Sequence, residues 1–188
     1  MRKLLVCVAA GLLFASCNPP ESAEDLAATP APETTAPDGG NTSMEKCEDR
    51  KPELDEEELQ DTDKAPKVEV PEGAPPCDLV TQDVVEGDGK KAKEGATVTI
   101  QYTGVSWSTG EEFDSSWSRG EPATFPLGNL IPGWQEGIPG MKEGGRRVLF
   151  IPPDLGYGDQ GSPPAIAGGE TLIFVIDMID ADAEPSGG

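Results

Sequence analysis

Alternation of polar and apolar side chains predicts strands in the second half of the chain. Residues 97–103 alternate threonine and glutamine with valine, isoleucine and Tyr102, a period of two that is typical of a strand with one buried face. Residues 147–151 and 171–179 are largely apolar, β-branched runs of strand length. We therefore expect a sheet of short strands that carries Tyr102 on its buried face.

One short helix is predicted between these strands. Pro132 suits the first position of a helix, and Trp134 and Ile138 then lie four residues apart on one face. Gly133 and Gly137 lower the helix propensity of the segment. We expect this helix to form only by packing against the sheet.

The first half of the chain lacks such patterning. Residues 17–77 are rich in Pro, Glu, Ala, Thr and Asp and lack aromatic residues. A segment of this kind buries too little apolar surface to offset the entropy lost on ordering. We interpret it as a flexible acidic spacer, in which Leu54 and Leu59 mark at most one or two marginal helical turns. It has no heptad repeat that would support a coiled-coil dimer, so we expect a monomer.

The first sixteen residues have the zones of a secretory signal. Two basic residues precede an apolar run over residues 4–14, and small residues then lead to Cys17. The apolar run is too short to span a bilayer as a helix. We therefore divide the chain into a signal peptide (1–16), the spacer (17–77), a folded domain (78–181) and a disordered tail (182–188).

The end of this signal resembles the lipobox of bacterial lipoproteins, in which small residues end on a cysteine. The resemblance implies that Cys17 becomes a lipid-modified N-terminus, which would hold the chain on a membrane. An ordinary signal peptide with an incidental cysteine is the alternative. Asn18 in place of an acidic residue favours, by analogy, the periplasmic side of an outer membrane in the cell envelope.

Two cysteines remain after these assignments, Cys47 and Cys77. An even pair in an oxidising compartment indicates a disulfide, which would close a loop of about thirty residues. The sequence does not fix the separation of the two sulfur atoms. Two free thiols therefore stay open as the alternative.

The amino-acid composition limits the classes of partner and cofactor that the chain is expected to bind. With 35 acidic and 14 basic residues, the chain has a net charge of −21, which repels nucleic acid and anionic headgroups. Arg146 and Arg147 begin a strand and are expected to be surface charges. Histidine, the commonest metal ligand and general base, is absent from the sequence. We expect no nucleic-acid partner, no metal and no cofactor.

Short motifs of glycine, aromatic and acidic residues follow one another through the predicted domain. They lie at residues 86–89, 101–104, 109–116, 125–128, 131–137, 151–158 and 171–177. In their order and spacing they resemble the FKBP-type peptidyl-prolyl isomerases, the immunophilin family that binds tacrolimus and rapamycin. The resemblance implies an α+β fold, in which an antiparallel sheet half-wraps one short helix.

Prolyl isomerisation makes few chemical demands. An Xaa–Pro amide rotates over a barrier of about 20 kcal/mol because resonance gives its C–N bond double-bond character. The twisted amide is less polar, so a dry apolar site that fits it lowers the barrier. Neither a nucleophile nor a metal is needed.

The resemblance also assigns the site residues. Trp134 would be the floor beneath the proline ring, and Asp114 would orient the site. The backbone N–H of Ile131 and the hydroxyl of Tyr157 would each donate to a substrate carbonyl. The walls and rims would be Tyr102, Phe113, Phe174, Leu130 and Ile166.

Two small residues depart from the family pattern. Ala123 stands where many members have a second pocket phenylalanine, and Ala165 where a bulky aliphatic residue is frequent. They predict a pocket that is wider on one side and binds macrolide inhibitors less tightly. Phe125 is assigned to the core beneath the pocket.

Three functional hypotheses follow. The first, which we favour, is an envelope-anchored prolyl isomerase that accelerates folding of exported, proline-containing polypeptides. The second is a non-catalytic chaperone or binding module that holds such segments in the same pocket. The third is a structural lipoprotein whose aromatic residues are merely core. The acidic surface is expected to disfavour acidic substrates at low salt.

Overall fold

The computed structural model describes residues 47–183. The signal sequence, Cys17, the spacer up to residue 46 and the last five residues lie outside this range. Within residues 47–183, no helix is long and apolar enough to cross a membrane.

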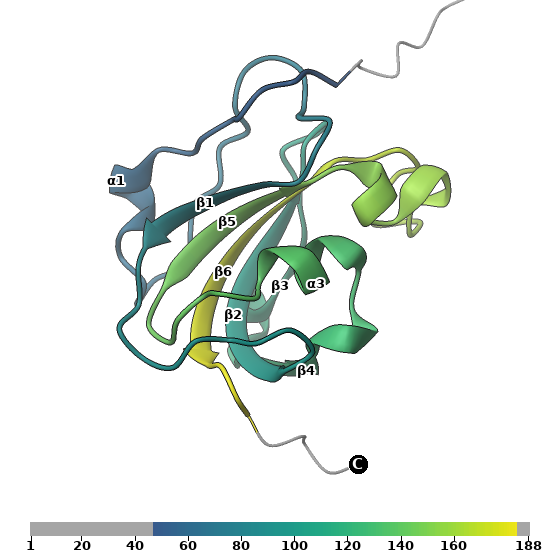
Figure 1. Cartoon of the computed structure of the whole chain (residues 1–188). Helices are drawn as coiled ribbons and strands as arrows, with labels where there is room; N and C mark the ends of the chain where they lie inside the picture. Colours follow the sequence, from purple (N-terminus) through teal and green to yellow (C-terminus); the bar gives the residue numbers. More distant parts are fainter. Residues whose placement is uncertain (1–46, 184–188) are drawn as a thin grey trace, which may run out of the picture. The chain divides into compact units, whose positions relative to one another are not determined.

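The described part of the chain is built around one antiparallel sheet of six strands (Figure 1). The strand order is β1-β5-β6-β2-β3, and β4 also pairs with β2. The bounds are β1 Val80–Val85, β2 Thr97–Ser106, β3 Glu112–Ser115, β4 Ala123–Pro126, β5 Arg146–Ile151 and β6 Leu172–Asp180. The predicted strands at 97–103, 147–151 and 171–179 are confirmed as β2, β5 and β6.

Short helices connect these strands. They are α1 Glu56–Leu59, α2 Ser116–Arg119, α3 Pro132–Gly137 and three 3-10 turns, η1 Leu127–Asn129, η2 Pro153–Leu155 and η3 Gly158–Gln160. The predicted helix at Pro132 is confirmed as α3.

One face of the sheet packs against α3. Trp134 and Ile138 join a core with residues of β2, β5 and β6, and Ile138 is fully buried. Gly133 permits the close approach, because a Cβ atom there would lie 2.5 Å from Cγ2 of Ile151. The glycines that weaken α3 as an isolated helix thus allow it to reach the sheet.

The opposite face of the sheet is covered by residues 47–77, which we call the covering segment. Leu54 and Leu59 are buried in a second apolar cluster with side chains from the sheet. The sheet residues of this cluster are Val84, Val105, Val148, Phe150, Ile173 and Val175, with Trp107 just after β2. The prediction of a flexible spacer is therefore wrong for residues 47–77, and so is the domain boundary at residue 78. Few apolar residues suffice to order the segment because the sheet supplies a ready apolar surface.

Arg146 ties the covering segment to the sheet. Its guanidinium group is buried and donates to both carboxylate oxygens of Asp177 on β6, one at 2.9 Å. It also donates to the backbone carbonyls of Leu59 (2.9 Å), Asp61 (3.1 Å) and Lys64 (3.0 Å). The prediction of a surface charge is wrong for Arg146, because a counter-charge and three acceptors compensate its burial.

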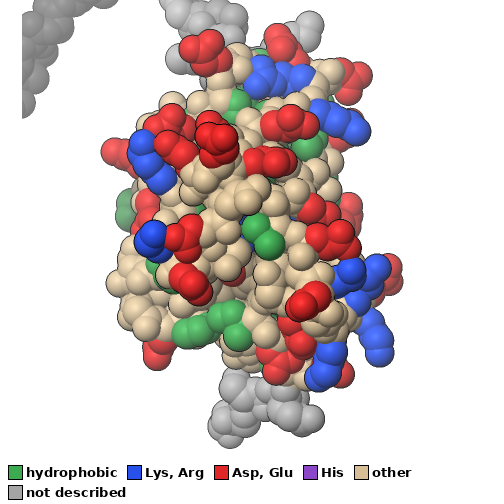
Figure 2. Space-filling model, turned by 90° about the vertical axis from the view of Figure 1, so that its left-hand side faces the viewer, with side chains coloured by type: hydrophobic (Ala, Val, Ile, Leu, Met, Phe, Trp, Pro, Cys, Tyr) green, Lys and Arg blue, Asp and Glu red, His purple; other side chains and the backbone are tan. Residues whose placement is uncertain are grey.

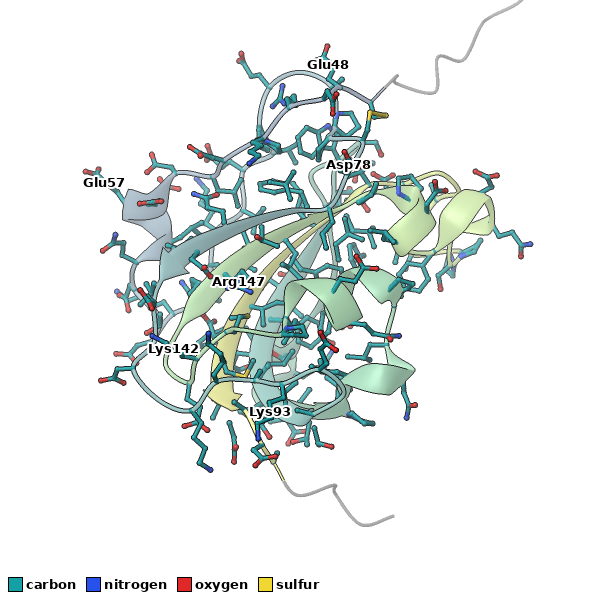
Figure 3. The ribbon with its side chains drawn as sticks, viewed as in Figure 1. Glu48, Glu57, Asp78, Lys93, Lys142 and Arg147 are labelled. Carbon is teal, nitrogen blue, oxygen red and sulfur yellow. A yellow bond between two sulfur atoms is a disulfide. The ribbon has the colours of Figure 1, made fainter. Side chains whose placement is uncertain are left out.

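Arg147 is half-buried and points to the other face of β5 (Figure 3). It donates to both carboxylate oxygens of Asp83 on β1, at 2.6 and 2.9 Å, and to the carbonyl of Gly137 at 2.8 Å. These bonds join β1, β5 and the end of α3.

A disulfide closes the covering segment. Cys47 and Cys77 are bonded, with their Cα atoms 4.9 Å apart. Figure 3 shows the bond between the chain near Glu48 and the chain near Asp78. The face that carries α1 has many acidic side chains (Figure 2), whereas Leu54 and Leu59 of the covering segment are buried against the sheet.

Replacing Leu59 with alanine is expected to lower the free energy of unfolding by about 2–5 kcal/mol, because this leucine is only 1% exposed. Glu58→Ala is the matched control, since Glu58 is an exposed neighbour in α1 and its loss should cost less than about 0.5 kcal/mol. Urea unfolding of the purified chain measures both. Equally small effects would show that the covering segment does not pack on the sheet.

Candidate active site

A cavity of about 240 Å³ lies among α3, the sheet and the turn before η3. Eight of the nine residues predicted for the site line it. The lining residues are Tyr102, Phe113, Asp114, Phe125, Leu130, Ile131, Trp134, Tyr157 and Phe174. Segments that are far apart in the sequence therefore build one mainly aromatic site.

The aromatic rings of the cavity hold one another in place. Trp134 packs edge-to-face against Phe174 at 5.0 Å, Tyr102 at 5.3 Å and Phe125 at 6.0 Å between ring centroids. Phe113 packs edge-to-face on Phe174 at 5.4 Å. Edge-to-face pairs are favourable because the positive edge of one ring meets the negative face of the other. The result is a set of apolar walls with fixed orientations.

Gly104 on β2 is required for this arrangement. A Cβ atom at this position would lie 2.7 Å from the rings of both Phe113 and Phe174, closer than carbon atoms pack. Gly104 pairs directly with Phe174 across β2 and β6. The glycine therefore leaves the space in which the two rings meet.

One side of the cavity is polar. The Tyr102 hydroxyl donates to Oδ2 of Asp114 at 2.6 Å. Arg119 donates to both of these side chains, at 2.7 Å to the Tyr102 oxygen, and its guanidinium carbon lies 5.4 Å from the centre of the Tyr102 ring. Burial, with the Asp114 hydrogen bond second, raises the pKa of Tyr102. The phenol therefore stays protonated and remains a donor at neutral pH.

Arg119 is a site residue that the sequence did not reveal. It is an exposed residue at the end of α2, five positions after Asp114. Only the one-turn helix brings its side chain back over Tyr102. The one available signal was its closeness in sequence to the motif at residues 109–116.

Two donors that are predicted to hold substrate carbonyls make no hydrogen bond within residues 47–183, and neither does Nε1 of Trp134. The two donors are the backbone N–H of Ile131 and the hydroxyl of Tyr157. Tyr157 is 40% exposed, which is high for a large aromatic residue. Burial of part of its ring raises the pKa of Tyr157, so it too keeps its proton. Both groups are available to a ligand carbonyl.

Two predictions about the pocket walls, those for Phe125 and Ile166, turn out differently. Phe125, assigned to the core, lines the cavity. Ile166 is only 4% exposed and belongs to the core around Trp134, and it is not among the residues that line the cavity. Ala123 is half-buried against that core and also does not line it. Phe125 is therefore a wall of the cavity that the sequence analysis had placed in the core.

Acidic and cysteine side chains do not gather into a metal site in the described part of the chain. The cavity has an apolar floor and walls, one polar edge, and the free donors of Ile131 and Tyr157. Such a site binds the less polar, twisted form of an amide better than the planar form.

Comparison with known proteins decides the family. The family of FKBP-type peptidyl-prolyl cis-trans isomerases matches residues 88–179. Over 116 residues the chain is 54% identical to a probable FK506-binding protein of Corynebacterium glutamicum. This match covers 62% of the chain and 98% of the relative. The chain belongs to the FKBP-type peptidyl-prolyl cis-trans isomerase family. It is therefore a prolyl isomerase.

Further comparisons agree with this assignment. The isomerase is 55% identical over 117 residues to an FK506-binding protein of Streptomyces anulatus, with 61% of this chain and 94% of the relative covered. The crystal structure of FkpA from Escherichia coli matches with a TM-score of 0.53 and 43% identity. That match covers 57% of the isomerase and 49% of the FkpA chain.

Trp134→Ala is expected to lower the kcat/KM of the isomerase about 10- to 100-fold, because the substrate proline loses the apolar surface beneath it and each tenfold corresponds to about 1.4 kcal/mol. Trp134→Phe should keep most of the activity. It retains a ring and loses no hydrogen bond, since Nε1 of Trp134 has no partner among the described residues. Circular dichroism checks that both variants fold. Equal activity losses in folded Ala and Phe variants would contradict a role for the ring as the floor.

Proposed function

We propose that this isomerase is held at the cell envelope by a lipid on Cys17 and accelerates the folding of exported, proline-containing polypeptides. The observation that carries the proposal is the disulfide between Cys47 and Cys77, which closes a packed part of the chain. Disulfides persist in oxidising compartments and are rare in the cytosol. The signal-like residues 1–16, which end before a cysteine, give the chain a route to such a compartment.

Catalysis is assigned to the aromatic cavity. The proline ring of the substrate lies on Trp134, and the amide before it twists in the space bounded by Phe113 and Phe174. The N–H of Ile131 and the hydroxyl of Tyr157 each hold a carbonyl on one side of the twisting bond. With both ends held, the twisted geometry is reached without loss of further orientational freedom.

Tyr102 and Asp114 are assigned a positioning role. Their hydrogen bond and the contacts of Arg119 fix the one polar edge of the cavity. The dipoles of this edge are therefore already oriented when the carbonyl before proline turns towards them. The phenol does not have to transfer a proton, because bond rotation moves none.

Macrolides that present a proline-like ring are proposed to compete for the same cavity. This proposal draws support from relatives that are named FK506-binding proteins. In addition, the free donors of Ile131 and Tyr157 suit two ligand carbonyls. We propose that the enzyme acts as a monomer on the periplasmic side of the membrane, with the outer membrane favoured.

The purified chain is expected to accelerate cis-to-trans conversion of a Leu-Pro peptide, and excess rapamycin should abolish the acceleration. A coupled spectrophotometric assay measures the rate with and without the drug. Acceleration that persists at saturating rapamycin would place catalysis outside the aromatic cavity.

Cys17→Ser is expected to abolish lipid attachment. Metabolic labelling with a radioactive fatty acid, followed by separation of membrane and soluble fractions, measures the label and the location together. Cys7→Ser is the matched control within the signal-like segment and should remain labelled and membrane-bound. Labelled Cys17→Ser protein, or unlabelled natural protein, would refute the lipid anchor.

A further inference from the structure

A second cavity, of about 390 Å³, adjoins the aromatic one. It lies between the β2–β3 turn and residues 162–170, the loop that precedes β6. Phe113 lines both cavities, so a ligand that passes this ring reaches from one into the other. We call the second cavity the acidic groove.

The acidic groove carries three carboxylates, Glu111, Glu112 and Glu170, and its lining contains neither lysine nor arginine. None of the three forms a salt bridge within residues 47–183. Chemically, the groove is a negative site without its own counter-charge.

Glu170 is the most informative of the three. It is only 8% exposed. Its two oxygens accept from the backbone N–H and the hydroxyl of Ser108, at 2.9 and 2.6 Å. These bonds satisfy the polar atoms but leave the negative charge uncompensated in a place that little water reaches. A cation in the groove would gain more from such a buried charge than from an exposed one.

The opposite wall of the groove is apolar and open. Pro164, Ala165 and Ala167 line it and are exposed. Lysine and arginine bury an aliphatic stem against apolar surface while the charged head reaches polar groups. A bare metal ion fits less well, because no three acidic side chains in the described part converge on one point.

We propose that the acidic groove extends the substrate site and takes the lysine or arginine side chain of a residue within two positions of the proline. This inference rests on the proposed binding of the proline on Trp134. Because consecutive residues advance by about 3.3–3.6 Å, one or two residues carry a peptide past the Phe113 ring. The preferred substrates are thus prolyl segments with a nearby basic residue.

A peptide series tests the preference. The peptides share a Leu-Pro core and carry Lys, Glu or Gln two positions before, one after or two after the proline. At low ionic strength, the Lys peptide should exceed the Glu peptide in kcat/KM by about fivefold or more at one of these positions. Equal values at all three positions would overturn the groove proposal. Failure to accelerate even the Gln peptides would instead refute the proposed function.

Charge reversal separates the groove from the general acidity of the surface. In the Glu111→Lys variant, the kcat/KM of the Lys peptide should equal or fall below that of the Glu peptide at the preferred position. Glu94→Lys is the matched control, because it changes the net charge equally at an exposed position before β2, outside both cavities. Equal changes in the two variants would assign the preference to long-range charge and overturn the proposal.

A steric variant tests the same site without altering charge. Ala165→Phe places a ring in the groove at an exposed position. The kcat/KM of the Lys peptide divided by that of the Glu peptide should then fall at least about threefold. An unchanged ratio in folded Ala165→Phe protein would show that the basic side chain does not enter the groove.

Discussion

Burial of both faces of β6 is the constraint on which the rest of the structure depends. Residues 172–178 are all buried, although side chains of a strand alternate between two faces. One face needs α3 and the aromatic rings, and the other needs the covering segment. In this chain the two layers together keep the apolar side chains of both faces of β6 from water.

The same strand links the covering segment to the catalytic cavity. Phe174 lines the cavity, while its neighbours Ile173 and Val175 lie in the cluster that contains Leu54 and Leu59. The segment thus supports from behind the strand that carries a wall of the site. Arg146 and the disulfide add polar and covalent attachments to this apolar contact.

Sequence patterns predicted those strands, helices and site residues that are determined by residues near them in the sequence. The period of two at residues 97–103 identified β2. Of the nine site residues that the ordered motifs predicted, eight line the cavity. The covering segment escaped prediction because Leu54 and Leu59 are too sparse to signal order by themselves; their partner surface lies far away in sequence. Arg146 was misassigned for the same reason, since its counter-charge and acceptors come from distant segments. Arg119 escaped because only tertiary geometry turns its side chain over the cavity.

The most direct test compares the unfolding free energies of chains that begin at residue 47 and at residue 78. We expect one cooperative transition for the longer chain and a much lower unfolding free energy, or no folded state, for the shorter one. The lost layer includes Leu54, Leu59 and the acceptors of Arg146. Equal stability of the two chains would contradict the claim that β6 must be covered on both faces.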